Sequence, residues 1–366
     1  MQTGDGLLAR IRISSGRLTP TQLAGLAQLA LTHGNGLIEV SARGTLQVRG
    51  LTADTASSFA QAVNALLPVE RGLVVETPPL AGDDPAEIAD PLPLAAAIRR
   101  AARPWEPRLG PKVSVVVDGC GQITLANSKA DIRVTAQNSD HWLVTVGGAT
   151  PMPLAGHEVA DHVSSFLGRL AALGSDARAT DLALPGPAQP VKAGSPPIGR
   201  FRLRQGTAFG FALPFGAASG QMMQLLAKAA AAHNIGELRL APAHGILALD
   251  APPVFEKDVA ALGFVTSLTD PRRMISACIG SDGCRSGRLP ARRLAAQLAQ
   301  SLPFGTRLHI SGCPKGCAHP RRAPLTLVGL EEGAGLVIEG RAGDTPQQML
   351  GKDQIESGLA QALQQA

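Results

Sequence analysis

The opening segment of the chain has a strand-like pattern, which gives way to apolar residues at helical spacing. Residues 7–12 are expected to form a strand, and Thr19 to Gln22 then carry a capping-box pattern with a proline at the first helical position. A helix is therefore predicted to begin there and to end at His33. Short strands are predicted over 37–40 and 45–48. The apolar helix positions share one face: Leu23, Leu26, Ala27 and Ala30.

The same pattern returns later in the chain, which indicates an internal repeat. A turn at 213–216, an apolar helix stripe and a stop at 233–236 match the first copy at an offset of 200. One inserted residue then predicts an offset of 201, which would align His244 with Arg43. Such a small unit cannot bury its own sheet face, so the copies are expected to pack together with pseudo-twofold symmetry. The second helix stripe comprises Met223, Leu226, Ala227 and Ala230.

The remaining segments predict two larger units that mix helices and strands. A hairpin of 112–117 with 122–125 and an amphipathic helix over 157–173 are expected after the first copy. A proline-rich linker, 184–197, precedes the second copy. A helix over 288–301 is expected beyond it, and three further strands over 307–311, 325–330 and 335–339. The predicted fold class is α+β, in four units: 1–75, 76–190, 198–270 and 271–366.

Composition narrows the class of protein. The 366 residues include no run of roughly 18 to 20 apolar residues and no leader-like start, so a cytoplasmic protein without a membrane span is expected. The 27 Arg and 7 Lys outnumber the 29 acidic residues, which suits an anionic partner such as a polycarboxylate. Nucleic acid is not expected as a partner, because aromatic residues make up only 3% of the chain and Tyr is absent.

Four of the five cysteines form two close pairs. Cys278 and Cys284 enclose five residues, Cys313 and Cys317 enclose three, and neighbouring glycines allow close backbone approach. Four thiolates are enough to hold a four-iron cubane cluster. Structural zinc is the competing interpretation, although zinc knuckles favour two intervening residues, and unbound thiols are the third. Cys120, in a glycine-flanked turn, is expected to be a spare thiol.

The cysteine spacing and the repeat together resemble a known superfamily. Cys-x5-Cys followed by Ser-Gly-Cys-x3-Cys, after a half-domain repeat, resembles the sirohaem-type nitrite and sulfite reductases over nearly the whole chain. Within that superfamily, residues 311–320, residues 79–85 and the short length look most like the precorrin-3B synthase family. The resemblance implies ferredoxin-like half-domains packed with two larger α/β domains.

The resemblance also implies a reaction, the monooxygenation of precorrin-3A, which is a polycarboxylate tetrapyrrole. Dioxygen would hydroxylate C20 and the ring A acetate would close a lactone, on the oxygen-dependent route to cobalamin. A mononuclear non-haem iron is a further implication, for which His319 is the best-placed histidine. No Gly-x-Gly-x-x-Gly loop lies between a strand and a helix, so electrons from NADH would arrive through a separate reductase or ferredoxin.

Members of the superfamily bind their tetrapyrrole against basic side chains, and several such positions have counterparts here. Arg12 matches the Arg before the first turn, and Arg43 and Gln47 resemble a Thr-x-Arg-x-x-x-Gln segment with Ser in place of Thr. Lys112 matches the Lys that opens the second domain. His244 is a further candidate for contact with the tetrapyrrole or iron. On the residues alone, solvated strand ends are the favoured interpretation of the three cations.

Two departures from the reductase pattern weaken the expectation of anion reduction. The second Lys of the reductases is Ser114 here, and Arg71 is out of register with their second Arg. Fewer cations at the anion site would remove much of the electrostatic stabilisation for reducing nitrite or sulfite. A sirohaem-dependent nitrite or sulfite reductase remains the alternative enzyme. A non-catalytic cluster protein is the alternative outside enzymes, because no acid-base constellation is identified.

Overall fold

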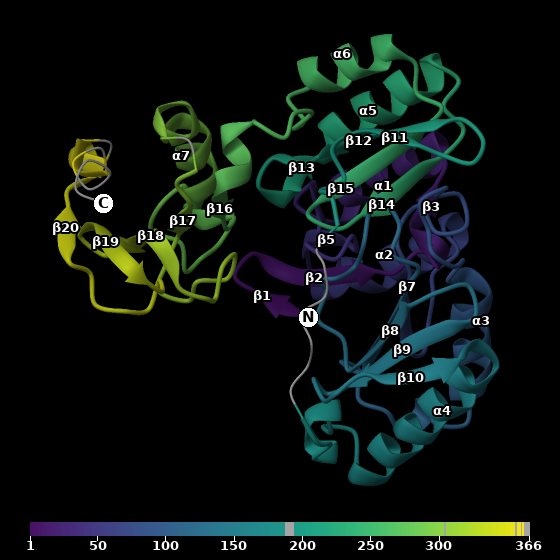
Figure 1. Ribbon diagram of the computed structural model, residues 1–366. Coiled ribbons are helices and arrows are strands. Elements are labelled where there is room, and N and C mark those ends of the chain that lie inside the picture. Colours follow the sequence, from purple (N-terminus) through teal and green to yellow (C-terminus); the bar gives the residue numbers. More distant parts are fainter. Residues whose placement is uncertain (187–193, 304, 356, 360, 362–366) are drawn as a thin grey trace.

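The described residues form four five-stranded sheets with helices against them. Figure 1 shows the fourth sheet, at the C-terminal end, set apart from the other three. No helix of the described residues is both long enough and apolar enough to cross a membrane. Residues 187–193 of the predicted linker lie outside the described residues. The computed structural model describes residues 1–186, 194–303, 305–355, 357–359 and 361.

The first sheet belongs mainly to the N-terminal copy, and its helix begins where the sequence predicts. The Gln22 N–H donates to Thr19 Oγ1 at 3.2 Å, and the Thr19 N–H donates to Gln22 Oε1 at 2.9 Å, so the capping box is complete. The helices are α1 (Pro20–His33) and α2 (Ala53–Leu66). In spatial order the strands are β1 (Gln2–Thr3), β2 (Gly6–Ile11), β5 (Leu46–Leu51), β4 (Leu37–Val40) and β13 (Ala217–Ser219).

The second copy builds a pseudo-symmetric sheet, and each sheet ends on a strand from the other copy. Strand β13 pairs with β4, while β3 (Arg17–Leu18) of the first copy pairs with β14 (Leu238–Ala241). This reciprocal exchange joins the copies through backbone hydrogen bonds and is not predicted by the sequence pattern. The strands are β11 (Gly199–Arg202), β12 (Thr207–Ala212), β15 (Gly245–Leu249), β14 (Leu238–Ala241) and β3 (Arg17–Leu18), with helices α5 (Gly220–Ala232) and α6 (Pro253–Ala261).

The strand register corrects one prediction. Residues paired across the two equivalent strand pairs keep an offset of 200: Val40 with Leu46, and Leu240 with Ile246. The predicted insertion and the alignment of His244 with Arg43 are therefore wrong. His244 occupies the position of Gly44, and both residues have a left-handed backbone, with φ of 66° and 76°. The left-handed position repeats between the copies, whereas the dipeptide that suggested an insertion does not.

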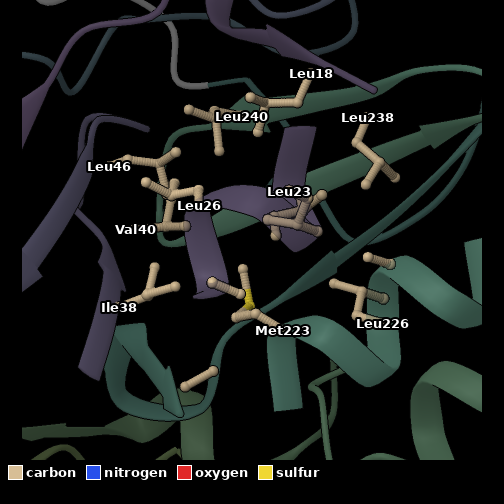
Figure 2. Close-up of a cluster of buried hydrophobic side chains, with 14 of the residues drawn as sticks. Leu18, Leu23, Leu26, Ile38, Val40, Leu46, Met223, Leu226, Leu238 and Leu240 are labelled. Carbon is tan, nitrogen blue, oxygen red and sulfur yellow. The ribbon is translucent and has the colours of Figure 1, made fainter. Parts of the chain in front are cut away.

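The two copies share one hydrophobic core. Helices α1 and α5 pack against each other, and Figure 2 shows Leu23 and Leu26 of α1 near Met223 and Leu226 of α5, all of them buried. Burying one such side chain contributes about 1.5–3 kcal/mol. A single copy would expose this face, so the expected pseudo-twofold packing is confirmed and has a physical cause.

The chain between the two copies forms the second sheet and the two helices that accompany it. The predicted unit boundary after residue 75 falls inside strand β6 (Val74–Glu76), and the unit boundaries stay predictions. The helices are α3 (Leu92–Ala102) and α4 (Gly156–Leu173). In spatial order the strands are β10 (Met152–Ala155), β9 (His141–Val146), β8 (Ile132–Ala136), β7 (Ser114–Asp118) and β6 (Val74–Glu76).

The predicted hairpin of 112–117 with 122–125 is wrong. Strand β7 pairs in parallel with β6 and β8 instead, and 122–125 is not a strand. The Asp118 carboxylate accepts hydrogen bonds from the backbone N–H of Cys120 at 2.8 Å and of Leu125 at 2.6 Å, so this segment folds back over the strand end. Burial and the nearby Asp118 raise the pKa of the Cys120 thiol to about 11, which leaves it unreactive at neutral pH.

The fourth sheet follows the expected order of elements. Helix α7 (Ala291–Leu298) is shorter than the predicted 288–301, because it starts after Pro290 and continues as a 3-10 turn at Ala299–Ser301. The three strands predicted there are all present. In spatial order the sheet contains β16 (Ile275–Ala277), β17 (Leu308–Ser311), β18 (Ala323–Leu330), β19 (Gly333–Gly340) and β20 (Gln348–Leu350).

Candidate functional site

Both cysteine pairs lie at one edge of the fourth sheet. Strands β16 and β17 are parallel neighbours, so their carboxyl ends meet at the same edge. Cys278 follows β16 directly, and Cys313 lies two residues beyond β17. Cys284 and Cys317 lie further along the same two loops. Parallel strand pairing therefore brings together two sequence motifs that are far apart in the chain.

Glycines allow the two cysteine loops to touch. A Cβ on Gly312 would lie 2.7 Å from Gly280 Cα, and Gly280 has a left-handed φ of 67°. The Gly312 N–H donates to Cys278 Sγ at 3.1 Å, a contact that favours the thiolate. The first copy reaches this loop too, because a Cβ on Gly4 would overlap Cys284 Sγ. The loops are thus held from both sides.

A cavity of about 760 Å³, called the large cavity below, opens beside the four cysteines. The outer face of the first sheet, the turn between β14 and β15, and the cysteine loops contribute to its wall. Gln47 and His244 lie in this wall, so the structure brings both of these predicted residues to the cysteines. The volume is within the range of sites for small molecules and cofactors.

Cations dominate the charged groups of the large cavity apart from the cysteines. Glu39 is the one acidic residue among the described residues of its wall, against five basic ones. Fixed guanidinium and ammonium groups around a cavity favour a ligand with several carboxylates. The basic residues are Arg49, Arg272, Arg273, Arg292 and Lys315.

Glu39 joins two of these cations and two parts of the fold. Arg49 Nη1 lies 3.2 Å from Glu39 Oε2, and Arg49 also binds Asp5 through Nε at 2.8 Å and Nη2 at 2.6 Å. Arg292, on α7, pairs with the other carboxylate oxygen of Glu39. All four side chains are largely buried. The network therefore ties the unit that carries the cysteines to the first sheet.

Two packed turns separate the large cavity from a second one of about 100 Å³, called the small cavity below. The Ala243 N–H donates to the Ala42 carbonyl at 2.9 Å, which joins the equivalent turns of the two copies. Ala42 and His244 line the large cavity, whereas Arg43 and Pro242 line the small one. Neighbouring residues of one turn thus serve different cavities.

The small cavity contains Arg12 and Arg43, together with Glu70, Glu76 and Arg99. Arg12 Nη1 and Glu76 Oε2 are buried and have no hydrogen-bond partner among the described residues. Burial raises the pKa of Glu76 above its ordinary value, and the attraction of Arg43 and Arg12 only partly opposes this. The contacts of Arg12 and Arg43 with a tetrapyrrole stay predictions.

The other residues singled out in the sequence line neither cavity. Lys112 is exposed before β7, Ser114 is buried in β7, and Arg71 is exposed before β6. The His319 Nε2–H donates to the Arg322 carbonyl at 3.2 Å, away from the large cavity. The roles suggested for Lys112 and His319 stay predictions.

The other three cysteines act electrostatically on Cys317. Burial raises the pKa of the Cys317 thiol, and Cys278, Cys313 and Cys284 raise it further, while Lys315 lowers it. All four thiols are free of disulfides. A positively charged metal centre offsets the charge of thiolates that lie close together. The donor set fits an iron-sulfur cluster held by thiolates alone.

Sequence reasoning missed Glu39, Arg49 and Arg292. A signal existed for the first two, because Glu39 alternates with buried apolar neighbours in β4, and Arg49 shares a strand face with Gln47. Arg292 lies 253 residues beyond its partner Glu39 in the chain. No local pattern links such distant residues, so the pair is visible only in the folded chain.

Comparison with known proteins identifies a family model and curated relatives that match this chain. Residues 1–66 match the model of the nitrite/sulfite reductase ferredoxin-like half domain. A precorrin-3B synthase from Sinorhizobium sp is 36% identical over 392 residues, covering 98% of this chain and 85% of the relative. The chain belongs to the precorrin-3B synthase family. The resemblance inferred from the cysteine spacing and the repeat is thereby confirmed.

The precorrin-3B synthase family lies within the nitrite/sulfite reductase superfamily. A ferredoxin-nitrite reductase of Synechococcus elongatus is 24% identical to this chain over 415 residues, covering 93% of the chain and 81% of the relative. The structure of the Mycobacterium tuberculosis NirA protein shares the fold, with a TM-score of 0.68 at 20% identity over 98% of this chain and 80% of that one. The predicted α+β fold with ferredoxin-like half-domains is confirmed.

Proposed function

We propose that this chain is a precorrin-3B synthase, a monooxygenase of cobalamin biosynthesis. It hydroxylates C20 of precorrin-3A and closes a lactone from the ring A acetate. The observation that carries the proposal is the 36% identity to the Sinorhizobium precorrin-3B synthase over 98% of the chain. Identity at that level over nearly the full length extends beyond the half-domain to every unit of the fold.

The large cavity supports a polycarboxylate substrate. Its wall holds five basic side chains, and Gln47 adds an amide between strands β2 and β4. Arg273 and Lys315 are the best-placed partners for substrate carboxylates, because no salt bridge of the described residues compensates their charge, whereas Arg292 and Arg272 are paired with Glu39 and Asp270. Arg12, Arg43 and Lys112 are proposed as outer contacts for the same substrate.

The four cysteines are proposed to hold one four-iron, four-sulfur cluster. When bound, the cluster supplies single electrons to the large cavity, which side chains alone cannot do. Cys278, Cys284, Cys313 and Cys317 hold the irons, and the Gly312 N–H stabilises one thiolate. Electrons originate from NADH and arrive through a separate reductase or ferredoxin. Free thiols suit a reducing compartment, so we place the protein in the cytoplasm.

A mononuclear iron has less support. No three His, Cys, Asp or Glu side chains among the described residues form a group that could hold one metal ion. His319 is turned to the Arg322 carbonyl. The residues present do not fit a preformed mononuclear site, and no step is assigned to one.

Labelled dioxygen tests the proposed function. The anaerobically purified protein is supplied with precorrin-3A, NADH, a reductase and isotopically labelled dioxygen, and the product is analysed by mass spectrometry. One labelled oxygen atom in the product hydroxyl is expected. A product without label, or no conversion by protein that contains its cluster, would refute the proposal.

A matched pair of cysteine variants tests the cluster assignment. Cys284→Ser is expected to lose most of the bound iron, the cluster absorption and all turnover, because one thiolate ligand is gone. Cys120→Ser is the control, since Cys120 lies in the second unit and its thiol hydrogen-bonds, among the described residues, to the Ala136 carbonyl alone. It should keep the iron content and turn over within about twofold of the wild type. Equal iron loss in both variants would contradict the assignment.

A sirohaem-dependent nitrite or sulfite reductase is the second candidate. The similarity to the Synechococcus elongatus nitrite reductase over 93% of the chain favours it. A bound sirohaem would give chlorin-type absorption bands that a cluster alone lacks. Reduction of nitrite or sulfite by protein with those bands would support this candidate over the monooxygenase.

A further inference from the structure

The turn between strands β1 and β2, residues 3–6, lies against a cysteine loop and is called the clamp turn below. A Cβ on Gly4 would overlap Cys284 Sγ, so only a glycine fits at this point. The Arg285 N–H donates to the Gly4 carbonyl at 2.9 Å. Figure 1 shows β1 and β2 reaching toward the unit that carries the fourth sheet. Main-chain atoms of the first half-domain thus pack directly on a cysteine sulfur.

Two features hold the clamp turn in place. Gly6 has a positive φ of 114°, and a Cβ there would lie 2.7 Å from the Leu51 carbonyl oxygen, so the turn requires glycine at this position too. Arg49 donates to the Asp5 carboxylate through Nε at 2.8 Å and Nη2 at 2.6 Å. The Asp5 side chain is only 2% exposed. Buried, charge-assisted bonds of this kind are strong, so the turn has little freedom to move.

The clamp turn belongs to a closed ring of contacts that returns to the cysteine loop. Arg49 also pairs with Glu39, which binds Arg292 on α7. The segment that leads into α7 is bonded to the cysteine loop in turn, because the Ser281 N–H donates to the Leu289 carbonyl at 2.7 Å. One network therefore holds the cysteine loop from two sides.

The surroundings of a thiolate-held cluster affect its chemistry. Contacts to the sulfur atoms and their solvent exposure tune the reduction potential, and fixed neighbours help to retain the metal. The reduced cluster carries one more negative charge than the oxidised cluster, so water near a sulfur favours the reduced form and raises the potential. Cys317 is exposed, whereas Cys284 is half-buried beside the clamp turn. Backbone packed on Cys284 therefore keeps water from that side.

We propose that Gly4 is a positioning residue for the cluster, which fixes Cys284 and excludes water from its sulfur, with Asp5 as the anchor of the clamp turn. This rests on the proposed four-iron cluster. It gives the first half-domain a task at the cluster in addition to its share of the cavity wall. Displacing the clamp turn should change both the retention of iron and the reduction potential. Destabilising the same half-domain elsewhere should leave the potential unchanged.

A matched pair of glycine variants tests the contact with Cys284. In Gly4→Ala the new methyl group displaces the sulfur or the turn, so iron should pass to a ferrous chelator about tenfold faster than from the wild type. Gly236→Ala is the control, because Gly236 is exposed and a Cβ there would meet nothing within 4 Å. Its rate of iron release should stay within about twofold of the wild type.

The reduction potential tests the anchor. Asp5→Ala frees the clamp turn from Arg49, so water reaches Cys284 and the reduced form should be favoured about tenfold, or about 59 mV for a one-electron couple. A redox titration followed by electron paramagnetic resonance measures this. Val63→Ala is the control, because it creates a cavity under α2 in the core of the same half-domain. An equal shift of potential in both variants would overturn the proposal.

Hydrogen exchange of the wild-type protein provides a test that needs no variant. The Arg285 N–H, bonded to Gly4, should exchange at least about 100-fold more slowly than in an unstructured peptide. Unprotected exchange at Arg285, or equal iron release from Gly4→Ala and Gly236→Ala, would overturn the clamp. Iron and sulfide counts of the wild type test the cluster itself. Protein without iron would refute the cluster and the clamp together, whereas loaded protein with an unprotected Arg285 would refute the clamp alone.

Discussion

In the first half-domain, the row of side chains on the outer face of the sheet is polar. Arg10, Gln47 and Glu39 lie next to one another across strands β2, β5 and β4. With its amide nitrogen toward Glu39, Gln47 donates to Oε2 at 3.2 Å and accepts from Arg10 Nε at 3.3 Å. Gln47 and Glu39 border the large cavity. The first copy thus presents hydrogen-bonding groups to a ligand.

The equivalent row of the second half-domain is Gly210, Leu247 and Arg239. Leu247 is fully buried under Leu80 and Ile123, which belong to the unit between the copies. Arg239 is also buried and binds that unit through the Pro79 carbonyl at 3.1 Å and Asp83 at 2.6 Å. The second copy thus uses the same face to bind the rest of the chain.

The difference teaches how one repeat can support two tasks. Side chains alternate between the two faces of a strand, so the inner face can keep a shared core while the outer face changes freely. The inner residues at matching positions are apolar in both copies, as Leu46 and Ile246 illustrate. The outer residues at matching positions differ in charge, as Glu39 and Arg239 illustrate.

The largest loss of stability is expected when Leu247 of the second copy is replaced by glutamine, the residue at the matching position 47 of the first copy. Leu247→Gln replaces a buried Leu and places an amide against Leu80, so unfolding free energy should fall by about 4 kcal/mol from lost apolar burial and an unpaired polar group. Urea unfolding followed by circular dichroism measures this. A loss below about 1 kcal/mol would mean that the face is not sealed as described.

Glu39 and Arg239 occupy matching positions, and removing the charged side chain should weaken a different contact in each copy. Glu39→Ala leaves Arg49 and Arg292 without their shared carboxylate and should cost about 3 kcal/mol. Arg239→Ala should cost about 2 kcal/mol, because its partners Asp83 and Glu237 are partly exposed and can be hydrated.

Hydrogen exchange locates these two effects. Glu39→Ala should speed exchange in α7, which carries Arg292, and Arg239→Ala should speed exchange in 79–84. Glu39→Gln is the control, because it keeps hydrogen bonding at that position without the charge. Faster exchange in the same segment for both alanine variants would contradict the division of tasks between the faces.

The reverse substitution in the first copy should affect binding rather than folding. Gln47→Leu removes an amide at the edge of the cavity, so precorrin-3A should bind about tenfold more weakly, equivalent to one lost hydrogen bond of about 1.4 kcal/mol. Unfolding free energy should change by less than about 1 kcal/mol. Anaerobic absorption titration and urea unfolding measure the two. Unchanged affinity would remove Gln47 from the site.

The smallest effect concerns Asp5 and Arg49, a pair that the second copy lacks because Leu249 stands in place of Arg49. Burial acts to raise the pKa of Asp5, but hydrogen bonds from Arg49 outweigh it and hold the pKa below the ordinary 3.8. The folded pKa is lowered, so the stabilisation is present above pH 3.8 and is lost as pH falls through the folded value.

Acid unfolding of the wild type and Asp5→Asn tests this pair. The stability advantage of the wild type should be constant near neutral pH and shrink below pH 4. Leu249→Ala is the control in the second copy and should show no such change with pH. A difference between wild type and Asp5→Asn that persists to low pH would contradict the ion pair.

Much of the local structure could be predicted because the stabilising partner lies nearby in the chain. The Thr19 and Gln22 cap begins α1 as expected, since both groups lie within one helical turn. The hairpin predicted for 112–117 with 122–125 was wrong because the Asp118 side chain competes for the backbone N–H groups of that segment. Propensity and spacing do not reveal such competition.

Only the parts of the site whose residues lie close together in the chain were predicted. Cysteine spacing and glycine content indicated the cluster loops, because both are read within short segments. The separation of Arg43 from the large cavity depends on how the turns of two copies pack, with Ala243 bound to Ala42. The alignment of His244 with Arg43 was wrong as well, since strand register is set by pairing and not by a matching dipeptide.

The sequence by itself determined the repeat, the inner core positions, the helix start and the cysteine donor set. Each depends on side-chain period or on spacing along a few residues. Only the tertiary structure decided which sheet face is covered, which cavity each Arg lines, and that Glu39 meets Arg292. The physical reason is that an alternating strand specifies two faces, whereas what buries a face comes from distant parts of the chain.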